Sequence, residues 1–192
     1  KIAEDGEILA KGPNVMLGYY KDPKKTAEVM TGDYFHTGDK GEIDSEGFLK
    51  ITGRKKEIFK TSGGKYISPI LLENEMKQSR FIEQILVIGE GQKMPAAIVQ
   101  PNFEFVKEWI KLHDINCGHT HEEIALNKEV HDRIMQEIDL GNQQFGKWET
   151  IKTFEMTSEV WSVDNELLTP TFKPKREVIL KKYKHLYDKV YS

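Results

Sequence analysis

The chain has 192 residues, 38% of them hydrophobic and 31% charged, a composition typical of globular proteins rather than disordered ones. The 28 basic and 31 acidic residues give a formal charge of −3, which argues against a general nucleic-acid binder. The single cysteine, Cys117, excludes an internal disulfide framework, and no apolar run approaches the roughly 20 residues that span a bilayer, so we expect neither a membrane span nor a signal peptide.

The N-terminal part of the chain has the pattern of a small β-rich piece. Residues 1–20 and 41–52 contain short alternating segments that are typical of strands. The turn residues Asp44–Gly47 join two of these segments and predict a hairpin, and a short helix is expected after Pro23. Because the chain begins with Lys1 and enters a strand pattern at once, we expect it to be cut from a larger protein.

Strand-like segments recur through the rest of the chain. In chain order they are "EIFK", "IEQILVIG", "AAIVQP" and "TIKTFEM", and the glycine loop "TSGGKYIS" follows the first. Helical patterns interleave with them without a strict β-α-β repeat. The sequence therefore predicts an α+β fold with a β-rich piece over residues 1–53, a boundary at 54–57 and a second domain over 58–192.

Helix starts are marked by capping residues or proline. The predicted starts are Ser68–Pro69, Asn102, Thr120 with a capping box to Glu123, and the region of Pro174. The helical region after Thr120 is expected to run to about Gly141, and the one near Pro174 to continue almost to the end of the chain.

Two sets of residues suggest function, but a structural role is the better interpretation. The first set invites a metal site, yet no second cysteine or close carboxylate pattern completes it, so none is predicted: Cys117, His119, His121 and His131. The second set is aromatic and is expected to pack in the core instead of stacking on bases: Phe103, Phe105, Trp109, Trp148 and Trp161.

Three short motifs could carry chemistry. Thr37-Gly38-Asp39 is expected in a turn between strands, where a carboxylate can hold a ribose, although an aspartate that stabilises its own turn is commoner. The loop "TSGGK" fails the Walker pattern, because Phe59 and Tyr66 occupy its required positions. Lys173 lies between two prolines in "LTPTFKPK", where it can place a cation against phosphate or carboxylate.

Four stretches in order resemble the AMP-forming acyl-CoA synthetases of the adenylate-forming superfamily. They are "GEILAKGPNVMLGYYKDPKKTAE", "YFHTGD", "GRKKEIFKTSGGKYISPILLE" and "LTPTFKPKR", and the last two are similar to the long-chain fatty acid branch. The resemblance covers nearly the whole chain. It implies that residues 1–53 end a large N-terminal adenylation domain, 54–57 form a hinge, and 58–192 form a mobile C-terminal lid domain.

The resemblance also implies an activity. Such enzymes convert a fatty acid and ATP into acyl-adenylate and pyrophosphate, then rotate the small domain and form a thioester with CoA. The phosphate loop, the acyl pocket and the Mg²⁺ ligands would lie upstream of Lys1, so this chain alone is expected to be inactive. The implied partners are fatty acid, ATP, CoA and the N-terminal domain, in the cytoplasm, with peripheral membrane contact left open.

The residues that match the nucleotide site and the hinge lie between positions 34 and 56. The resemblance implies that Asp39 binds the ribose hydroxyls and that Arg54 contacts the nucleotide, with Thr37 and Tyr34 in the same site. It implies that Lys56 is the residue whose backbone absorbs the rotation.

The residues that match the two half-reactions lie further along the chain. Lys173 matches the lysine that reaches the reacting carboxylate and α-phosphate. Many relatives have glycine where this chain has Phe172, so Lys175 stays open as a competitor. The loop expected to lie along CoA is Ser62, Gly63, Gly64 and Lys65.

Two other functions remain open from the sequence. A fatty acyl-AMP ligase that passes its product to a carrier protein would keep Asp39 and Lys173 and differ around the glycine loop. A noncatalytic interaction module would dock its basic tail on a partner or an acidic membrane surface. That tail, residues 169–192, has seven Lys and Arg against Glu177 and Asp188, a net charge of about +5.

Overall fold

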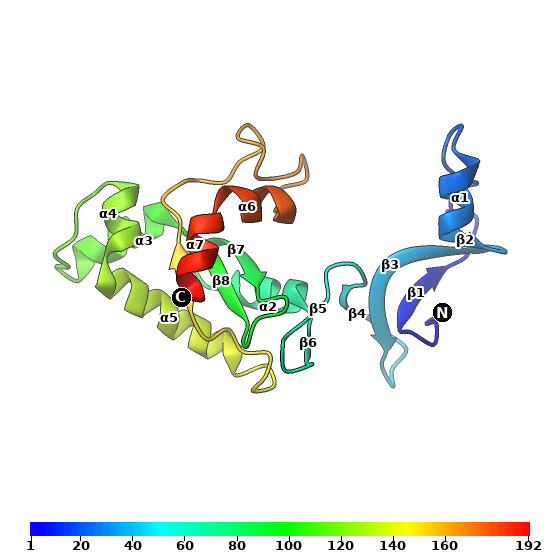
Figure 1. Ribbon diagram of the computed structural model, residues 1–192, viewed down its shortest axis with the longest axis horizontal. Coiled ribbons are helices and arrows are strands. Elements are labelled where there is room, and N and C mark those ends of the chain that lie inside the picture. The colour runs from blue at the N-terminus through cyan, green and yellow to red at the C-terminus, as the bar shows by residue number, and fades with distance from the viewer. The chain divides into compact units, whose positions relative to one another are not determined.

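A small antiparallel sheet organises the first 58 residues of the computed structural model, which describes residues 1–192 (Figure 1). The long strand β3 (Tyr34–Ile43) pairs with β1 (Glu7–Ala10), β2 (Met30–Thr31) and β4 (Leu49–Arg54). The predicted helix is α1 (Pro23–Val29), which has proline in its first turn and is capped by an aspartate side chain. This unit ends at Ile58.

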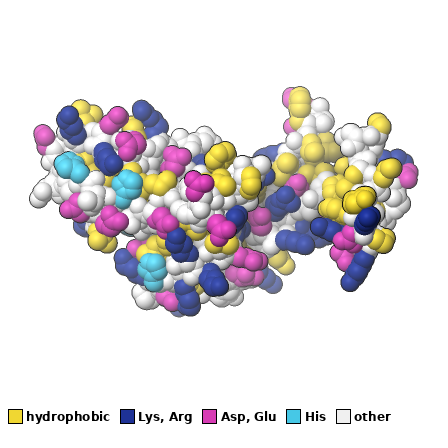
Figure 2. Space-filling model, turned by 90° about the horizontal axis from the view of Figure 1, so that it is seen from above, with side chains coloured by type: hydrophobic (Ala, Val, Ile, Leu, Met, Phe, Trp, Pro, Cys, Tyr) yellow, Lys and Arg dark blue, Asp and Glu magenta, His cyan; other side chains and the backbone are white.

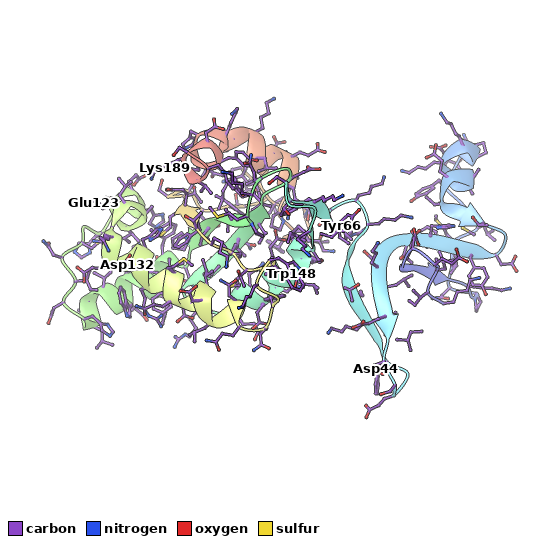
Figure 3. The ribbon with its side chains drawn as sticks, turned by 60° about the horizontal axis from the view of Figure 1, so that its bottom comes forward. Asp44, Tyr66, Glu123, Asp132, Trp148 and Lys189 are labelled. Atoms are coloured by element: carbon purple, nitrogen blue, oxygen red, sulfur yellow. The ribbon has the colours of Figure 1, made fainter.

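The predicted hairpin joins β3 to β4. Asp44 closes its turn, because its carboxylate accepts hydrogen bonds from the backbone N–H groups of Glu46 and Phe48, both at 2.9 Å. Figure 3 shows Asp44 at the tip of the hairpin. The turn chemistry read from the sequence is therefore confirmed.

The motif Thr37-Gly38-Asp39 lies inside β3 and not in a turn between strands, so that prediction is wrong. Opposite β1, Glu7 pairs with Lys40 and Leu9 pairs with His36. Two steps along β1 thus correspond to four along β3, which makes residues 37–39 a bulge. Gly38 has φ +73°, a conformation that glycine adopts without steric penalty.

The second unit, Phe59–Ser192, is built on a three-stranded sheet. Strand β8 (Ala96–Pro101) is central, antiparallel to β7 (Ile82–Ile88) and parallel to β9 (Phe154–Met156). A separate two-stranded hairpin, β5 (Phe59–Lys60) and β6 (Tyr66–Ile67), precedes it. The mixture of sheets and helices confirms the predicted α+β class.

Six helices cover both faces of this sheet. They are α2 (Pro69–Met76), α3 (Phe103–Leu112), α4 (His121–Leu126), α5 (Lys128–Asn142), α6 (Arg176–Lys182) and α7 (Lys184–Val190). Successive residues of a strand point to opposite faces, so Ile85 and Val87 join a core with α2, α3 and α5. Leu86 and Ile88 join a second core with α6 and α7, on the other side of the sheet (Figure 1).

Two predicted helices are each interrupted. Asn127 ends α4 with extended backbone (φ −75°, ψ 126°) and caps α5, because its side chain accepts a hydrogen bond from the N–H of Val130. Tyr183 separates α6 from α7, and its buried hydroxyl donates to Glu159 Oε2 at 2.8 Å. The first of these two segments, α6, begins at Arg176, two residues after the predicted start.

Four of the five aromatic residues expected in the core pack there. Phe103 and Trp161 are each 4% exposed, and Phe105 and Trp109 pack partly buried against the first core. The prediction for Trp148 is wrong, since its side chain is 54% exposed in the loop between α5 and β9. Separately, none of the helices combines the length and the apolar character that crossing a membrane requires.

Candidate functional site

Three of the four residues predicted to bind nucleotide meet at the bulge in β3. Asp39 pairs with Arg54 across the β3–β4 ladder, and its Oδ1 lies 3.1 Å from Arg54 Nε. The Thr37 hydroxyl donates to the carbonyl of Ile8 at 2.7 Å and accepts from the N–H of Asp39 at 3.1 Å. Tyr34 begins β3 and pairs instead with β2. Binding of a nucleotide by these residues stays a prediction.

A buried acid that sequence reasoning missed supports the bulge. Glu7 is 4% exposed, and its Oε1 accepts a hydrogen bond from the N–H of Gly38 at 2.9 Å. Hydrogen bonds to His36, Lys55 and Gly38 lower the pKa of Glu7, and the bond to His36 has the largest effect. Burial of the carboxylate acts in the opposite direction. The available signal was an acid at an inward position of the strand in "GEILAKG".

The residues of the predicted hinge form a tight turn after β4. The N–H groups of Glu57 and Ile58 both donate to the carbonyl of Arg54 at 3.0 Å. The ammonium of Lys55 contacts two carboxylates of the same unit, whereas Lys56 is exposed and its side chain has no polar partner. The role of Lys56 as the pivot stays a prediction.

The glycine loop is the turn of the β5–β6 hairpin, and it is organised by Thr61, which sequence reasoning missed. Thr61 is 6% exposed, and its N–H donates to the carbonyl of Lys65 at 2.9 Å. Its carbonyl accepts from Gly64, and its hydroxyl accepts from the N–H of Lys65 at 3.2 Å. Residues 62–65 are themselves exposed, and the N–H of Ser62 donates to the carbonyl of Gln92 at 2.9 Å.

The two glycines of this loop differ in what the fold requires. Gly64 has φ +81°, a conformation that other residues adopt only with strain. Gly63 lies outside that region, and an added Cβ would meet only Thr61 Oγ1, at 3.9 Å. The fold therefore needs glycine at position 64 but not at position 63.

An exposed aromatic pair lies beside the loop. Tyr66 follows the loop directly and is 66% exposed. The ammonium of Lys65 lies 5.2 Å from the ring centre of Trp148, which brings the α5–β9 loop next to the glycine loop (Figure 3).

Lys173 lies on a tight turn whose backbone is fixed. The N–H of Thr169 donates to the carbonyl of Lys173 at 2.8 Å, and the N–H of Lys173 donates to Thr169 Oγ1 at 3.0 Å. Phe172 completes the turn with φ +58°, the left-handed conformation that glycine adopts most easily. The side chain of Lys173 is exposed and its ammonium has no hydrogen-bond or ion-pair partner.

The competitor Lys175 has a different environment. It is the N-cap residue of α6, partly buried, and its N–H donates to the carbonyl of Leu167 at 2.9 Å. The next residue, Arg176, binds Glu73 Oε1 at 2.5 Å and also the carbonyl of Val87. Arg176 thus fastens the end of the Lys173 turn to α2 and β7.

The basic tail is largely paired with acidic residues. Lys182 binds Glu159 at 2.6 Å, and Lys189 binds Glu155 at 2.7 Å. Figure 2 shows basic and acidic side chains intermixed on the visible face instead of a continuous basic surface. This pairing weakens the interpretation of the tail as a docking surface.

Two of the histidines considered as metal ligands stack on aromatic rings, and Cys117 packs partly buried against the first core. The structure holds no group of three or more His, Cys, Asp or Glu residues that could bind a metal ion. His121 stacks on Phe103 with ring centres 3.8 Å apart, and His131 stacks on Phe154 at 4.3 Å. Burial raises the pKa of the Cys117 thiol, which opposes thiolate chemistry there.

Curated relatives of similar sequence are ligases. The chain is 39% identical to long-chain-fatty-acid–CoA ligase 1 of Cavia porcellus, over 98% of this chain and 27% of that protein. It is 32% identical to a long-chain-fatty-acid–CoA ligase of Mycobacterium tuberculosis, over 100% of this chain and 32% of that protein. The chain thus spans about a third or less of the length of these relatives.

Solved structures share the fold at low sequence identity. The adenylation domain of a carboxylate reductase from Mycobacterium chelonae superposes with a TM-score of 0.79 at 22% identity, covering 97% of this chain and 27% of that one. A carboxylic acid reductase domain from Segniliparus rugosus, in complex with AMP and a co-purified carboxylic acid, also gives 0.79 at 22% identity, covering 97% of this chain and 28% of that one.

The family profile described as the AMP-binding enzyme C-terminal domain matches residues 56–192, well over half of the chain. This range begins at the turn after β4 and includes both the glycine loop and the Lys173 turn. The resemblance read from the sequence is confirmed at this level, and the chain belongs to the family of AMP-binding enzyme C-terminal domains.

Proposed function

We propose that this chain is the C-terminal part of an AMP-forming long-chain fatty acid–CoA ligase. In the first half-reaction a fatty acid carboxylate oxygen attacks the α-phosphorus of ATP, and the bond to pyrophosphate breaks. In the second, the CoA sulfur attacks the acyl carbonyl, a thioester forms, and AMP leaves. The family match and the ligase relatives support this proposal.

In this function Asp39, Arg54 and Thr37 hold the nucleotide. The Asp39 carboxylate has acceptor capacity for both ribose hydroxyls beyond its contact with Arg54. The side chain of Asp39 is 27% exposed, so it can be reached. The backbone around it is hydrogen-bonded on both sides, which supports a site that needs little rearrangement on binding.

The observation that carries the proposal is the unpaired ammonium of Lys173 on a fixed turn. Carboxylate attack on a phosphate brings two anions together, and a placed cation lowers that barrier by about 3 kcal/mol. Lys173 needs to break no ion pair before it acts, and its backbone is already ordered. The ammonium of Lys175 has no ion pair either, but Lys175 is partly buried at the start of α6, whereas Lys173 is exposed.

The glycine loop is the proposed surface for CoA. The fold does not require glycine at position 63, and its presence leaves the loop free of a side chain there, which supports a path for CoA. Rotation about Lys56 would withdraw Lys173 after the first step and present Ser62–Lys65 for the second. One mobile domain would then serve both half-reactions.

Magnesium and location complete the proposal. ATP would bring Mg²⁺, and we expect its protein ligands in the rest of the enzyme. This chain has no group of three or more His, Cys, Asp or Glu residues that could hold a metal ion. We place the enzyme in the cytoplasm, with peripheral contact with a membrane as an open part of the proposal.

The test uses the full-length protein that carries this chain, with ATP, Mg²⁺, a long-chain fatty acid and CoA. We expect one AMP and one pyrophosphate for each acyl-CoA, and bound acyl-adenylate when CoA is omitted. Residues 1–192 alone serve as the matched control and should form no thioester. Release of ADP, or transfer to a carrier protein without transfer to CoA, would contradict the proposal.

A further inference from the structure

Glu7 is a buried carboxylate that the proposed reaction does not use. Both of its oxygens are engaged: Oε1 accepts from the N–H of Gly38 at 2.9 Å, and Oε2 lies 3.0 Å from both His36 Nδ1 and Lys55 Nζ. Its side chain is 5% exposed, against 47% for Asp5 in the same unit. A carboxylate is buried at a cost unless its partners compensate, so a sheet position of this kind is normally apolar.

The partners of Glu7 also bind one another. The N–H of Lys55 donates to the carbonyl of Gly38 at 2.8 Å, while the Lys55 ammonium binds Glu7 and, at 2.6 Å, Asp5. Glu7, Gly38 and Lys55 therefore form a closed triangle of side-chain and backbone contacts. The N–H of Glu7 in turn donates to Asp5 Oδ1 at 3.1 Å.

The neighbours of this triangle are the residues with proposed roles. Gly38 directly precedes Asp39, and Lys55 stands between Arg54 and Lys56. Movement of Gly38 would displace the Asp39 carboxylate, and movement of Lys55 would shift the point at which the chain starts to turn. The single side chain of Glu7 restrains both.

We propose that Glu7 is a positioning residue. It holds the bulge that carries Asp39 and the residue before the proposed pivot, Lys55, in one fixed arrangement. This inference rests on the proposed function for the meaning of the two sites it joins. Lys55 is fixed by its backbone and its side chain, so Lys56 is the first residue after β4 without such restraint. Rotation then starts at Lys56 and leaves the nucleotide-binding bulge undisturbed.

The first test is kinetic and uses Glu7→Gln, Lys55→Met and the double variant in the full-length enzyme. We expect each single variant to raise KM for ATP by about five- to tenfold, with kcat and KM for the fatty acid within about twofold of wild type. Because the two residues act as one unit, the double variant should resemble either single one. A purely structural role would lower the amount of active enzyme without changing KM.

The matched control is Lys50→Met. Lys50 lies on β4 and pairs with Glu42 at 3.8 Å, with both side chains more than 60% exposed. This substitution removes a lysine from the same strand without touching the triangle, and KM for ATP should not change. If Glu7→Gln gives the same KM as Lys50→Met while acyl-CoA is still made, the inference fails and the proposed function stands.

A second readout does not depend on catalysis. Loss of the Glu7 carboxylate leaves the Lys55 side chain with only the half-exposed Asp5 as a carboxylate partner, so the segment should open more often. We expect trypsin to cleave after residues 54–56 at least about fivefold faster in Glu7→Gln than in wild type. Cleavage after Lys50 in the same sample gives the internal reference. Equal rates at residues 54–56 in the two proteins would contradict the inference, whether or not the ligase activity is found.

Discussion

The Asp39 bulge and the Lys173 turn place their functional side chains in opposite ways. At the bulge the side chain itself is bound, because the Asp39 carboxylate lies 3.1 Å from Arg54 Nε. At the turn the backbone of Lys173 is bound to Thr169 on both sides, and the ammonium is unpaired. Both segments are ordered by hydrogen bonds, but only the Lys173 side chain can bind a new partner without first leaving another.

This difference matches what the proposed cycle asks of each residue. The nucleotide stays bound through both half-reactions, so a carboxylate that is already oriented by an arginine loses little on binding it. Lys173 acts only in the first half-reaction and must then leave. A side chain that would first have to break an ion pair is poorly suited to that exchange.

The largest loss of stability is expected from a substitution that removes the support of the Lys173 turn. Arg176→Met removes the guanidinium that binds Glu73, whose side chain is 12% exposed. Glu73 keeps the hydrogen bond from the N–H of Val87 at 2.8 Å, but it loses the positive charge that compensates its largely buried carboxylate. Removing one member of such an ion pair costs about 3 kcal/mol, which denaturant unfolding of the chain should register.

The control for Arg176→Met is Lys184→Met on α7. Lys184 pairs with Asp188 four residues on, with side chains 74% and 58% exposed, and such pairs contribute about 0.3–0.5 kcal/mol. Equal losses in the two variants would mean that Arg176 does not anchor the turn.

The next prediction addresses the bulge. Asp39→Asn in the full-length enzyme keeps the size of the side chain but removes the charge that orients it towards Arg54. We expect a loss of about 2 kcal/mol, roughly 30-fold in kcat/KM for ATP, because hydrogen bonds to charged groups are of that strength. Glu42→Gln, on the same strand but in an exposed pair, is the control. An effect confined to the fatty acid would contradict the assignment.

Substitutions at the two glycines of the loop should separate an effect on stability from an effect on the second half-reaction. Gly64→Ala should destabilise the chain by about 1 kcal/mol, because φ is +81° there. Gly63→Ala should leave stability unchanged and slow thioester formation from acyl-adenylate by about tenfold, without affecting adenylation. If the two variants changed stability to the same extent and also changed the rate of thioester formation to the same extent, there would be no argument for a CoA path at Gly63.

The smallest expected effect is on the pH dependence of the stability of the first unit, residues 1–58. The lowered pKa of Glu7 means that its carboxylate stabilises the fold above the ordinary glutamate value of about 4.3. That contribution is lost as the pH falls through the lower pKa of the folded state. The stability difference between wild type and Glu7→Gln should therefore shrink between pH 6 and pH 3 in denaturant titrations, and a constant difference would contradict the assignment.

Local signals in the sequence predicted much of this structure. The hairpin turn at Asp44, the cap at Asn102 and the capping box at Thr120 each depend on contacts within a few residues, and all three are present. The α+β class followed from the order of such local patterns.

The features that sequence reasoning missed depend on distant partners. The bulge exists only where β1 pairs with β3, and Glu7 is held by residues 29 to 48 positions away. Tyr183 breaks the last helix where its hydroxyl reaches Glu159, 24 positions back. No local pattern in the sequence contains such contacts. The sequence therefore indicated candidate functional residues such as Asp39 but not Glu7, which we propose positions it.

The most direct test of the central claim compares Lys173→Ala with Lys175→Ala in the full-length enzyme. Adenylation is measured as fatty-acid-dependent pyrophosphate release, and the second step as thioester formation from supplied acyl-adenylate. We predict that Lys173→Ala loses about 100-fold or more in the first step and keeps the second, while Lys175→Ala keeps both. Loss of adenylation in Lys175→Ala instead, or in neither variant, would contradict the assignment of Lys173.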